Sequence, residues 1–250
     1  MDKTNGARDQ TRRTLKAIVT GHTHGLGAAI ALTLARRHIP VLGIARGHSD
    51  KVELSAQASI SLDDAAAVAT WLASGALQDY LAGCDEVLLI NNAGTVQPVG
   101  PLSDQDPLQV ARAITLNVAA PLMLAAAVVQ ATQGKQRRIL HISSGAASSA
   151  YPGWSVYCAT KAALDQHARA VALDAQPGVR ICSLAPGVID TAMQAEIRAT
   201  PAERFPIRQR FVDMKRDGHL AAPEERAEQI IDYLLAAGFG ENPVDDIRNA

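Results

Sequence analysis

Five short runs of mostly apolar residues, separated by stretches with helical character, limit most strongly how this chain can fold. They are Leu15–Thr20, Val41–Ala45, Val87–Ile90, Arg138–Ile142 and Val179–Leu184. Apolar residues follow one another within these runs and do not alternate with polar ones, which predicts strands buried on both faces. Strands and helices in alternation favour the α/β class, with a parallel sheet covered by helices on both sides.

The stretches between these runs have the composition of helices. The first, Gly25–Arg37, is rich in alanine and leucine and ends in basic residues, which suit the C-terminal end of a helix dipole. Four further helices are predicted, the second of them interrupted near Asn117 and Pro121: Asp63–Leu72, Asp104–Gln133, Ser155–Asp174 and Pro223–Ala237. A short strand near Val244–Ile247 completes an expected sheet of about seven strands.

The length of 250 residues suits one large domain, and no repeat or low-complexity linker divides the chain. Residues 1–13 are polar, lack the apolar segment of a signal peptide and are expected to form a flexible tail before a single domain over residues 14–250. The region 191–220 is charged and contains Pro201 and Pro206. It is predicted to be a helical insertion that moves as a lid.

Composition argues against several classes of function. The net charge is −1 and aromatic residues make up 4% of the chain, so nothing indicates nucleic-acid binding. The longest apolar run, Val118–Val129, contains Pro121, is too short to cross a bilayer and is expected to be a buried helix. Three widely spaced cysteines form neither a metal-binding pattern nor a disulfide set, which favours reduced thiols in a cytoplasmic protein without a metal site.

A glycine-rich turn, T-G-H-T-H-G-L-G, follows the first predicted strand and leads into a helix. Glycine at such a turn lets the backbone approach a pyrophosphate, and the helix N-terminus offers free N–H groups. A tight turn that binds nothing is the alternative. The predicted dinucleotide contacts in this turn are Gly21, His22, Thr23, His24, Gly25, Leu26 and Gly27.

The end of the second predicted strand distinguishes between two dinucleotides. An acidic residue there would bind a ribose 2′-hydroxyl and repel a 2′-phosphate. This chain has Arg46 at that point, and the first acid, Asp50, lies beyond the turn. Because a guanidinium matches a phosphate in charge and geometry, Arg46 favours NADP(H) over NAD(H), a solvated arginine being the alternative.

Tyr157 and Lys161 are four residues apart in a predicted helix, and Ser144 precedes the tyrosine by thirteen residues. Residues at that helical spacing lie on one face. A cation beside a phenol lowers the tyrosine pKa, which makes the tyrosine a usable acid or base near neutral pH. Ser144 is placed to donate a hydrogen bond to a substrate oxygen. Taken alone, Y-x-x-x-K also occurs often on solvated helices.

Six motifs occur in an order and at spacings that resemble the short-chain dehydrogenase/reductase family. They are T-G-x-x-x-G-x-G at 20–27, N-N-A-G at 91–94, Asn117, Ser144, Y-x-x-x-K at 157–161 and P-G at 186–187. The resemblance covers nearly the whole chain after the tail. It implies a single Rossmann-like, doubly wound domain and an oxidoreductase acting on CH–OH or C=O groups.

Segments 153–165, 185–194 and 210–220 further resemble the sepiapterin reductases and the bacterial benzil reductases of that family. This likeness implies an NADPH-dependent reductase of ketones or vicinal dicarbonyls, with a small-molecule substrate. Two alternatives remain. An NAD(H)-dependent alcohol dehydrogenase is disfavoured by Arg46, and a non-catalytic dinucleotide sensor has little use for Ser144, Tyr157, Lys161 and Asn117 together.

The family resemblance also implies residue roles. Tyr157 would protonate the carbonyl oxygen, Lys161 would hold the nicotinamide ribose and tune Tyr157, and Ser144 would orient the carbonyl. Asn117 would anchor a water that links Lys161 to solvent. Besides Tyr157 and Lys161, further cofactor contacts are expected from Leu62, Asn91, Asn92, Ala93, Gly94, Pro186, Gly187, Val188 and Thr191.

Trp154 and Met193 are expected to face the substrate, and the segment 205–211 to close over it. For Trp154 a core or interface position is the alternative. Asp245 falls roughly where sepiapterin reductase carries a pterin-binding aspartate, a plain strand-end acid being the simpler interpretation.

One position departs from the family pattern. The aspartate that usually lies near the adenine is replaced by Ser61, and the following Asp63 and Asp64 are interpreted as helix caps. Separately, the helices 117–133 and 155–174 carry more apolar and alanine positions than one buried face requires. Together with the resemblance, this favours a homodimer or homotetramer, with surplus alanine as the alternative.

Overall fold

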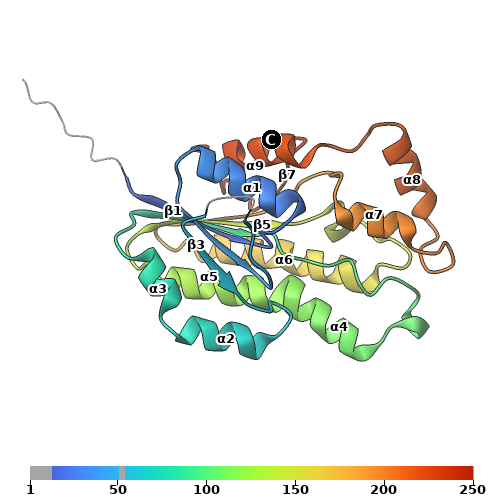
Figure 1. Ribbon diagram of the computed structural model, residues 1–250, viewed down its shortest axis with the longest axis horizontal. Coiled ribbons are helices and arrows are strands. Elements are labelled where there is room, and N and C mark those ends of the chain that lie inside the picture. Colours follow the sequence, from blue (N-terminus) through green and yellow to red (C-terminus); the bar gives the residue numbers. More distant parts are fainter. Residues whose placement is uncertain (1–12, 51–53, 250) are drawn as a thin grey trace, which may run out of the picture.

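The computed structural model describes residues 13–50 and 54–249, and a seven-stranded parallel sheet lies at its centre (Figure 1). The strand order is β3-β2-β1-β4-β5-β6-β7. The predicted Rossmann-like, doubly wound α/β fold is therefore confirmed. The strands are β1 (Leu15–Thr20), β2 (Val41–Ala45), β3 (Ala56–Ser59), β4 (Glu86–Asn91), β5 (Gln136–Ile142), β6 (Val179–Ala185) and β7 (Val244–Asp246).

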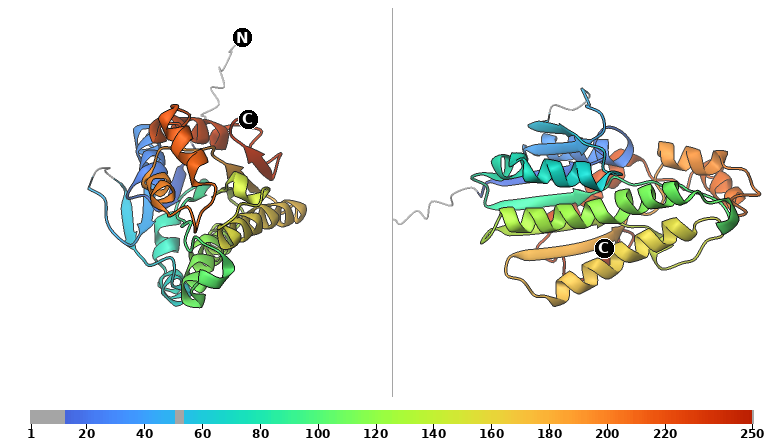
Figure 2. Two further views of the ribbon diagram at one scale, coloured as in Figure 1. Left: turned by 90° about the vertical axis from the view of Figure 1, so that its right-hand side faces the viewer. Right: turned by 90° about the horizontal axis from the view of Figure 1, so that it is seen from below.

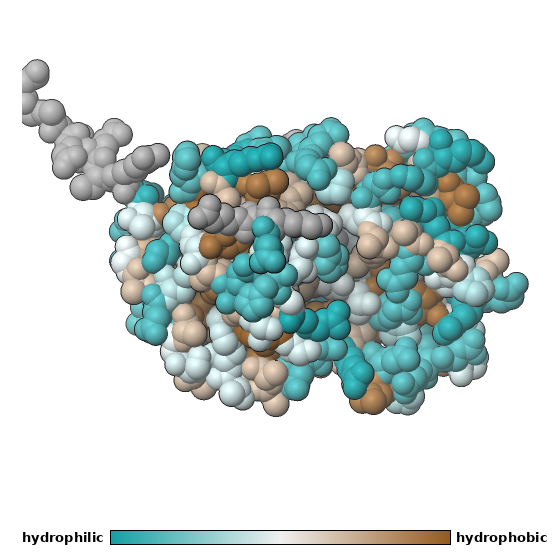
Figure 3. All heavy atoms as spheres, viewed as in Figure 1, coloured by the Kyte–Doolittle hydropathy of each residue, from teal (hydrophilic) through white to brown (hydrophobic). Residues whose placement is uncertain are grey.

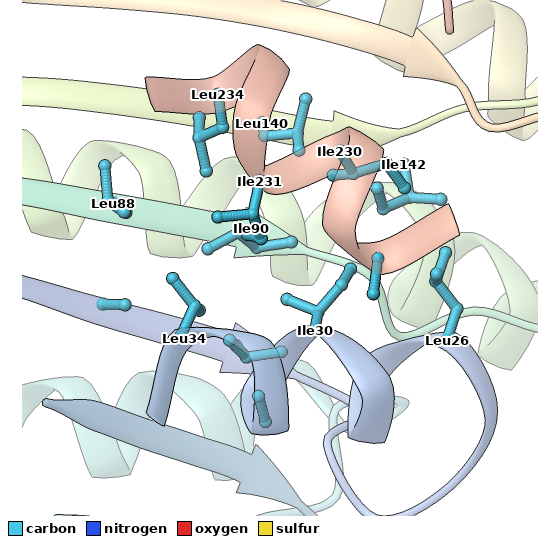
Figure 4. Packing of buried hydrophobic residues seen from close by; sticks show 14 of the residues in the cluster. Leu26, Ile30, Leu34, Leu88, Ile90, Leu140, Ile142, Ile230, Ile231 and Leu234 are labelled. Atoms are coloured by element: carbon cyan, nitrogen blue, oxygen red, sulfur yellow. The ribbon is translucent and has the colours of Figure 1, made fainter. Parts of the chain in front are cut away.

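Two helix layers cover the sheet, because successive strand residues point to opposite faces and both faces are apolar. On one face α1 (Gly25–Arg36) and α9 (Pro223–Leu235) pack over β1, β4 and β5. Figure 4 shows Ile30 and Ile231 from these two helices lying close to Ile90 of the sheet. On the other face lie α2 (Ala65–Ala73), α3 (Ala76–Leu81), α5 (Ala120–Ala131) and α6 (Ser155–Leu173).

The parallel register brings the carboxyl ends of the strands to one edge of the sheet. Val19 pairs with Ile90, and Ile90 pairs with Leu140, so the segments that follow β1, β4 and β5 leave the sheet side by side. The strand order changes direction at β1: β2 and β3 lie on one side of it and β4 to β7 on the other, and open α/β sheets form a ligand crevice at such a switch point.

The long apolar helix differs from the prediction in one respect. It continues without a break from α4 (Pro107–Ile114) through a π-helical turn, Thr115–Ala119, into α5, so Pro121 does not end it. The whole helix, Pro107–Ala131, has 25 residues and is long and apolar enough to cross a membrane by length and composition alone, although the apolar run Val118–Val129 within it is short. Its buried residues Leu124 and Val128 pack on the sheet, as expected for a core helix.

Two elements were not predicted from the sequence, β3 and α3. β3 has the sequence A-Q-A-S and lies at the edge of the sheet, so it lacks the apolar run that marks the inner strands. The region 191–220 does form two helices, α7 (Ala192–Ala199) and α8 (Arg208–Arg216), beyond the carboxyl ends of the strands (Figure 2). Of the predicted tail, residues 1–12 lie outside the described residues.

The surface view in Figure 3 mixes polar and apolar side chains over this face of the molecule. Polar side chains cover much of the area above α7 and α8, with apolar ones between them.

Candidate active site

A cavity of about 880 Å³ lies at the carboxyl edge of the sheet, at the switch point between β1 and β4. It brings together segments from most of the chain's length. The predicted site residues that line it are Gly21, Thr23, His24, Gly25, Leu26, Gly27, Arg46, Leu62, Asn92, Ala93, Gly94, Ser144, Trp154, Tyr157, Lys161, Pro186, Gly187, Val188, Thr191 and Met193. Three others, His22, Asn91 and Asn117, do not line it.

The start of α1 packs so closely against the glycine-rich turn after β1 that residue 27 has no room for a side chain. A Cβ on Gly27 would lie 2.1 Å from the Gly21 carbonyl oxygen and 2.4 Å from Asn92 Nδ2. His24 precedes α1 without capping its first N–H groups through its side chain. A backbone cradle at a helix N-terminus attracts anions, so this turn fits the pyrophosphate of a dinucleotide.

Thr20, at the end of β1, joins the turn to the segment after β4. Its Oγ1 accepts hydrogen bonds from the backbone N–H groups of Asn92 and Ala93, at 2.9 and 3.0 Å. Asn92 Nδ2 in turn donates to the Thr20 carbonyl oxygen at 2.9 Å. Asn92 thus shapes the cavity wall by fixing two loops to each other. Thr20 was not predicted as a site residue, although it precedes the glycines directly.

Tyr157 and Lys161 lie on α6, and Ser144 caps the short helical turn Gly145–Ala147 that follows β5. Lys161 Nζ donates to the Ile142 carbonyl oxygen at 2.8 Å and lies 5.6 Å from the centroid of the Tyr157 ring. Ser144 makes a side-chain hydrogen bond with Tyr157. The hydroxyls of Ser144 and Tyr157 and the ammonium of Lys161 therefore face one region of the cavity.

The electrostatics of this group differ from the expectation. Burial raises the pKa of Tyr157 to about 12, and the hydrogen bond from Ser144 only partly offsets this. Burial lowers the pKa of Lys161 to about 8, against the opposing charge of Asp165. The sequence suggested that Lys161 lowers the tyrosine pKa. In the structure burial raises that pKa, so the Tyr157 hydroxyl is protonated at neutral pH.

Asn117 lies in the π-helical turn and is buried behind the cavity wall. Its Oδ1 accepts from the Thr95 N–H at 2.9 Å, and its Nδ2 donates to the Thr95 carbonyl at 2.8 Å and to Thr160 Oγ1 at 3.1 Å. The side-chain amide is therefore engaged in holding the loop after β4 against α6. Its expected part in a water link to Lys161 stays a prediction.

Asn91 and His22 also point away from the cavity. Asn91 is buried, and its Nδ2 contacts His141 Nδ1 at 3.1 Å and the Pro121 carbonyl at 3.4 Å. His22 is fully buried, and its Nε2 contacts Gln57 Oε1 at 2.9 Å. Both side chains pack behind the loops that were expected to carry them into the site, and their assignment as cofactor contacts stays a prediction.

The end of the cavity near β2 and β3 carries a cation and an acid. Arg46 is exposed there. Asp63 also lines this end, and a 2.5 Å hydrogen bond from Ser61 Oγ, aided by the charge of Arg46, lowers its pKa. Asp64, in contrast, caps α2 through Ala66 and Ala67, as predicted. The acid that faces the cavity is thus Asp63, which had been interpreted as a cap.

Aromatic rings wall the other end of the cavity. Trp154 is only 4% exposed, stacks on Phe205 at 4.7 Å between ring centroids and touches Tyr151 and Phe211 edge-on or tilted. Tyr151 and Phe211 line the cavity as well. The sequence pointed to Trp154 and to the segment 205–211, but not to Tyr151.

The segment between α7 and α8 is anchored by these rings, because Phe205 is fully buried beneath them. α7 itself is largely exposed. Motion of residues 191–220 as a lid stays a prediction. Asp245, the residue compared with a pterin-binding aspartate, accepts a hydrogen bond from the Tyr233 hydroxyl at 3.0 Å and does not line the cavity; its neighbour Asp246 does.

Comparison with known proteins agrees with this site. A family model described as short chain dehydrogenase matches residues 15–202, so the chain belongs to the short-chain dehydrogenase family. It is 33% identical over 243 residues to a benzil reductase ((S)-benzoin forming) of Bacillus cereus, with 91% of this chain and 96% of that protein covered. It is 32% identical over 242 residues to sepiapterin reductase of Bos taurus, with 89% and 90% covered.

Among solved structures, the chain is similar to a short-chain dehydrogenase/reductase from Burkholderia vietnamiensis, with 48% identity, a TM-score of 0.69 and coverage of 94% and 98% of the two chains. The resemblance to the family and to its benzil and sepiapterin reductases is therefore confirmed. The family uses nicotinamide cofactors, and the glycine cradle and cavity described above fit such a group.

Proposed function

We propose that this protein is an NADPH-dependent carbonyl reductase acting on ketones, including vicinal dicarbonyls. The observation that carries the proposal is the convergence of Ser144, Tyr157 and Lys161 on a cavity whose other end carries Arg46. The similarity to benzil reductases over nearly the whole chain supports the substrate class.

Ser144, Tyr157 and Lys161 each have a separate role in the proposed reduction. A bound nicotinamide cofactor supplies the hydride. Ser144 and Tyr157 hold the carbonyl oxygen by hydrogen bonds, which stabilise the negative charge that develops there. Tyr157 then gives its proton to that oxygen as general acid. Lys161, a buried cation 5.6 Å from the tyrosine ring, stabilises the phenolate that remains.

The pKa of Tyr157 is compatible with a role as proton donor. At about 12 it keeps the hydroxyl protonated at neutral pH, so a proton is available for an alkoxide, which is a stronger base. The aromatic wall of Tyr151, Trp154 and Phe211 suits a substrate with aryl groups.

Arg46 supports the proposed preference for NADPH over NADH. Its guanidinium is exposed at the cavity rim, and no salt bridge joins it to an acid among residues 13–50 and 54–249. It is thus available to pair with a ribose 2′-phosphate, whereas an acid at the same place would repel one.

The test is the oxidation of NADPH, and separately of NADH, followed at 340 nm with benzil, other α-diketones, sepiapterin and simple ketones. Turnover of dicarbonyls with a strong NADPH preference is expected. Turnover with NADH alone, or only of alcohols with oxidised cofactor, would overturn the proposal in favour of an alcohol dehydrogenase. Cofactor binding without turnover of any tested compound would favour a sensor.

We also propose that the protein is cytoplasmic and that it self-associates as a homodimer or homotetramer through α5 and α6. Leu173 of α6 is 86% exposed, and Ile114 of the helix that leads into α5 is 46% exposed. Light scattering coupled to size-exclusion chromatography tests this, and a monomer at micromolar concentration would contradict it.

A further inference from the structure

We infer that Gln57, a residue of the short edge strand β3, positions the turn that carries Arg46 and thereby sets the preference of the protein for a cofactor with a 2′-phosphate. His22 holds Gln57 from behind. The inference rests on the proposed role of Arg46 and extends it to residues that do not line the cavity.

The Gln57 side chain makes three hydrogen bonds. Its Oε1 accepts from the backbone N–H of Ser49 at 2.8 Å, and its Nε2 donates to the Ser49 carbonyl oxygen at 3.0 Å. These two backbone groups fix which end of the amide is oxygen. His22 Nε2, 2.9 Å from the same Oε1, must therefore be the donor. The amide thus joins Ser49 to His22 of the glycine-rich turn.

The position of His22 is fixed by packing. Its ring is fully buried and lies against the backbone of β2, where a Cβ on Gly43 would come within 2.6 Å of it. The ring fits only because residue 43 is glycine. His22 therefore gives Gln57 a rigid partner in the turn that follows β1, the strand next to β2.

A second residue of β3 holds the same turn at its other end. Ser59 Oγ donates to the Arg46 carbonyl oxygen at 2.7 Å. Ser59 and Gln57 are two residues apart and so extend from the same side of the strand. Together they hold the backbone at Arg46 and at Ser49, so the turn between these residues is fixed at both ends.

Fixing this turn affects recognition because the Arg46 side chain is exposed and long. A guanidinium binds a phosphate more tightly when the backbone that carries it is already ordered, since less conformational entropy is lost on binding. Loss of the bridge is therefore expected to weaken the contact with the 2′-phosphate and to leave contacts with the rest of the nucleotide unchanged.

The experiment compares the binding of 2′,5′-ADP and 5′-AMP by isothermal titration calorimetry, because the two ligands differ by the 2′-phosphate. Gln57→Leu removes the three hydrogen bonds. We expect the affinity for 2′,5′-ADP to fall about tenfold and that for 5′-AMP to stay within twofold. Gln78→Leu, at an exposed position on α3, is the matched control and should change neither affinity.

Arg46→Ala separates this inference from the proposed function. If Arg46→Ala still binds 2′,5′-ADP more tightly than 5′-AMP by the wild-type factor, the assignment of Arg46 is wrong. If Arg46→Ala abolishes that advantage and Gln57→Leu retains it, the cofactor assignment stands and the inference about Gln57 is overturned.

Ser59→Ala keeps the test decisive if Gln57→Leu does not fold. It removes one hydrogen bond from an exposed position, so folding is expected to be preserved, and 2′,5′-ADP should bind about threefold more weakly. The inference would be overturned if folded Ser59→Ala bound 2′,5′-ADP as tightly as the wild type while Gln57→Leu did not fold. It would also be overturned if both variants folded and bound 2′,5′-ADP as tightly as the wild type.

Discussion

The catalytic end of the cavity is walled by buried aromatic rings, whereas its Arg46 end is an exposed turn held by polar side chains. Phe205 and Trp154 are 0% and 4% exposed and fix the start of α6, from which Tyr157 and Lys161 extend. Arg46 is exposed, and its turn is held by a hydrogen bond that Ser59 donates and one that Gln57 accepts.

The difference follows from what each end has to do. At the buried end, desolvation sets the protonation of the reacting groups, because it raises the pKa of Tyr157 and lowers that of Lys161. Binding of a phosphate dianion needs a cation that solvent and ligand can both reach. Changes at the buried end should therefore affect chemistry and stability, and changes at the exposed end should affect the choice of cofactor.

The largest expected effect is the loss of the acid at the buried end. Tyr157→Phe should lower kcat for a diketone by about 100- to 10,000-fold, because the variant lacks the proposed general acid. NADPH binding, measured by fluorescence, should stay unchanged. Tyr151→Phe removes a hydroxyl from the same cavity and should retain most activity. Equal losses in both variants would contradict the assignment.

The aromatic wall is expected to carry stability. Phe205→Ala should lower the free energy of unfolding by about 3–5 kcal/mol, because it leaves a cavity beneath Trp154. Urea denaturation measures this value. Leu102→Ala, at a side chain that is 81% exposed, should change it by less than about 0.5 kcal/mol. A small effect at Phe205 would show that the segment is a loose lid.

At the exposed end the expected effect is on cofactor choice. Arg46→Ala should raise KM for NADPH about 10- to 100-fold, because the variant loses a charge-assisted hydrogen bond to the 2′-phosphate. It should change KM for NADH little, because NADH lacks that phosphate. Arg36→Ala, another exposed arginine, is the control. Equal increases in KM for NADPH and for NADH would mean that Arg46 does not bind the 2′-phosphate.

The smallest expected effect is a pH dependence of stability from Lys161. Its pKa is about 8 in the folded protein against 10.5 for an ordinary lysine, so the unfolded chain binds more protons in this range. Stability therefore rises with pH through this window. From pH 7 to pH 9 the wild type should gain about 1 kcal/mol relative to Lys161→Met in urea denaturation. A difference in unfolding free energy between the wild type and Lys161→Met that stays constant from pH 7 to pH 9 would contradict the lowered pKa of Lys161.

Much of the buried part of this architecture could be predicted from the sequence. Inner parallel strands such as Val87–Ile90 are continuously apolar because helices cover both faces, so their positions are visible in the chain. The edge strand β3 was missed because its residues Gln57 and Ser59 are polar, and their partners on the turn lie several residues away.

The positions of single side chains were harder to predict. The glycine motif indicated that His22 faces the cofactor, but its ring turns into the space left by Gly43, a tertiary contact that local spacing does not encode. In the same way the four-residue spacing placed Lys161 near Tyr157 but gave no measure of burial, which decides the sign of the tyrosine pKa shift.

The most direct test of the central claim is to follow the hydride itself. The enzyme is incubated with benzil and NADPH carrying deuterium at both C4 positions of the nicotinamide, and the hydroxyketone product is analysed by mass spectrometry. We predict one deuterium on the carbinol carbon with the wild type and almost no product with Tyr157→Phe. A reduced product without deuterium, or equal product with Tyr157→Phe, would contradict the account.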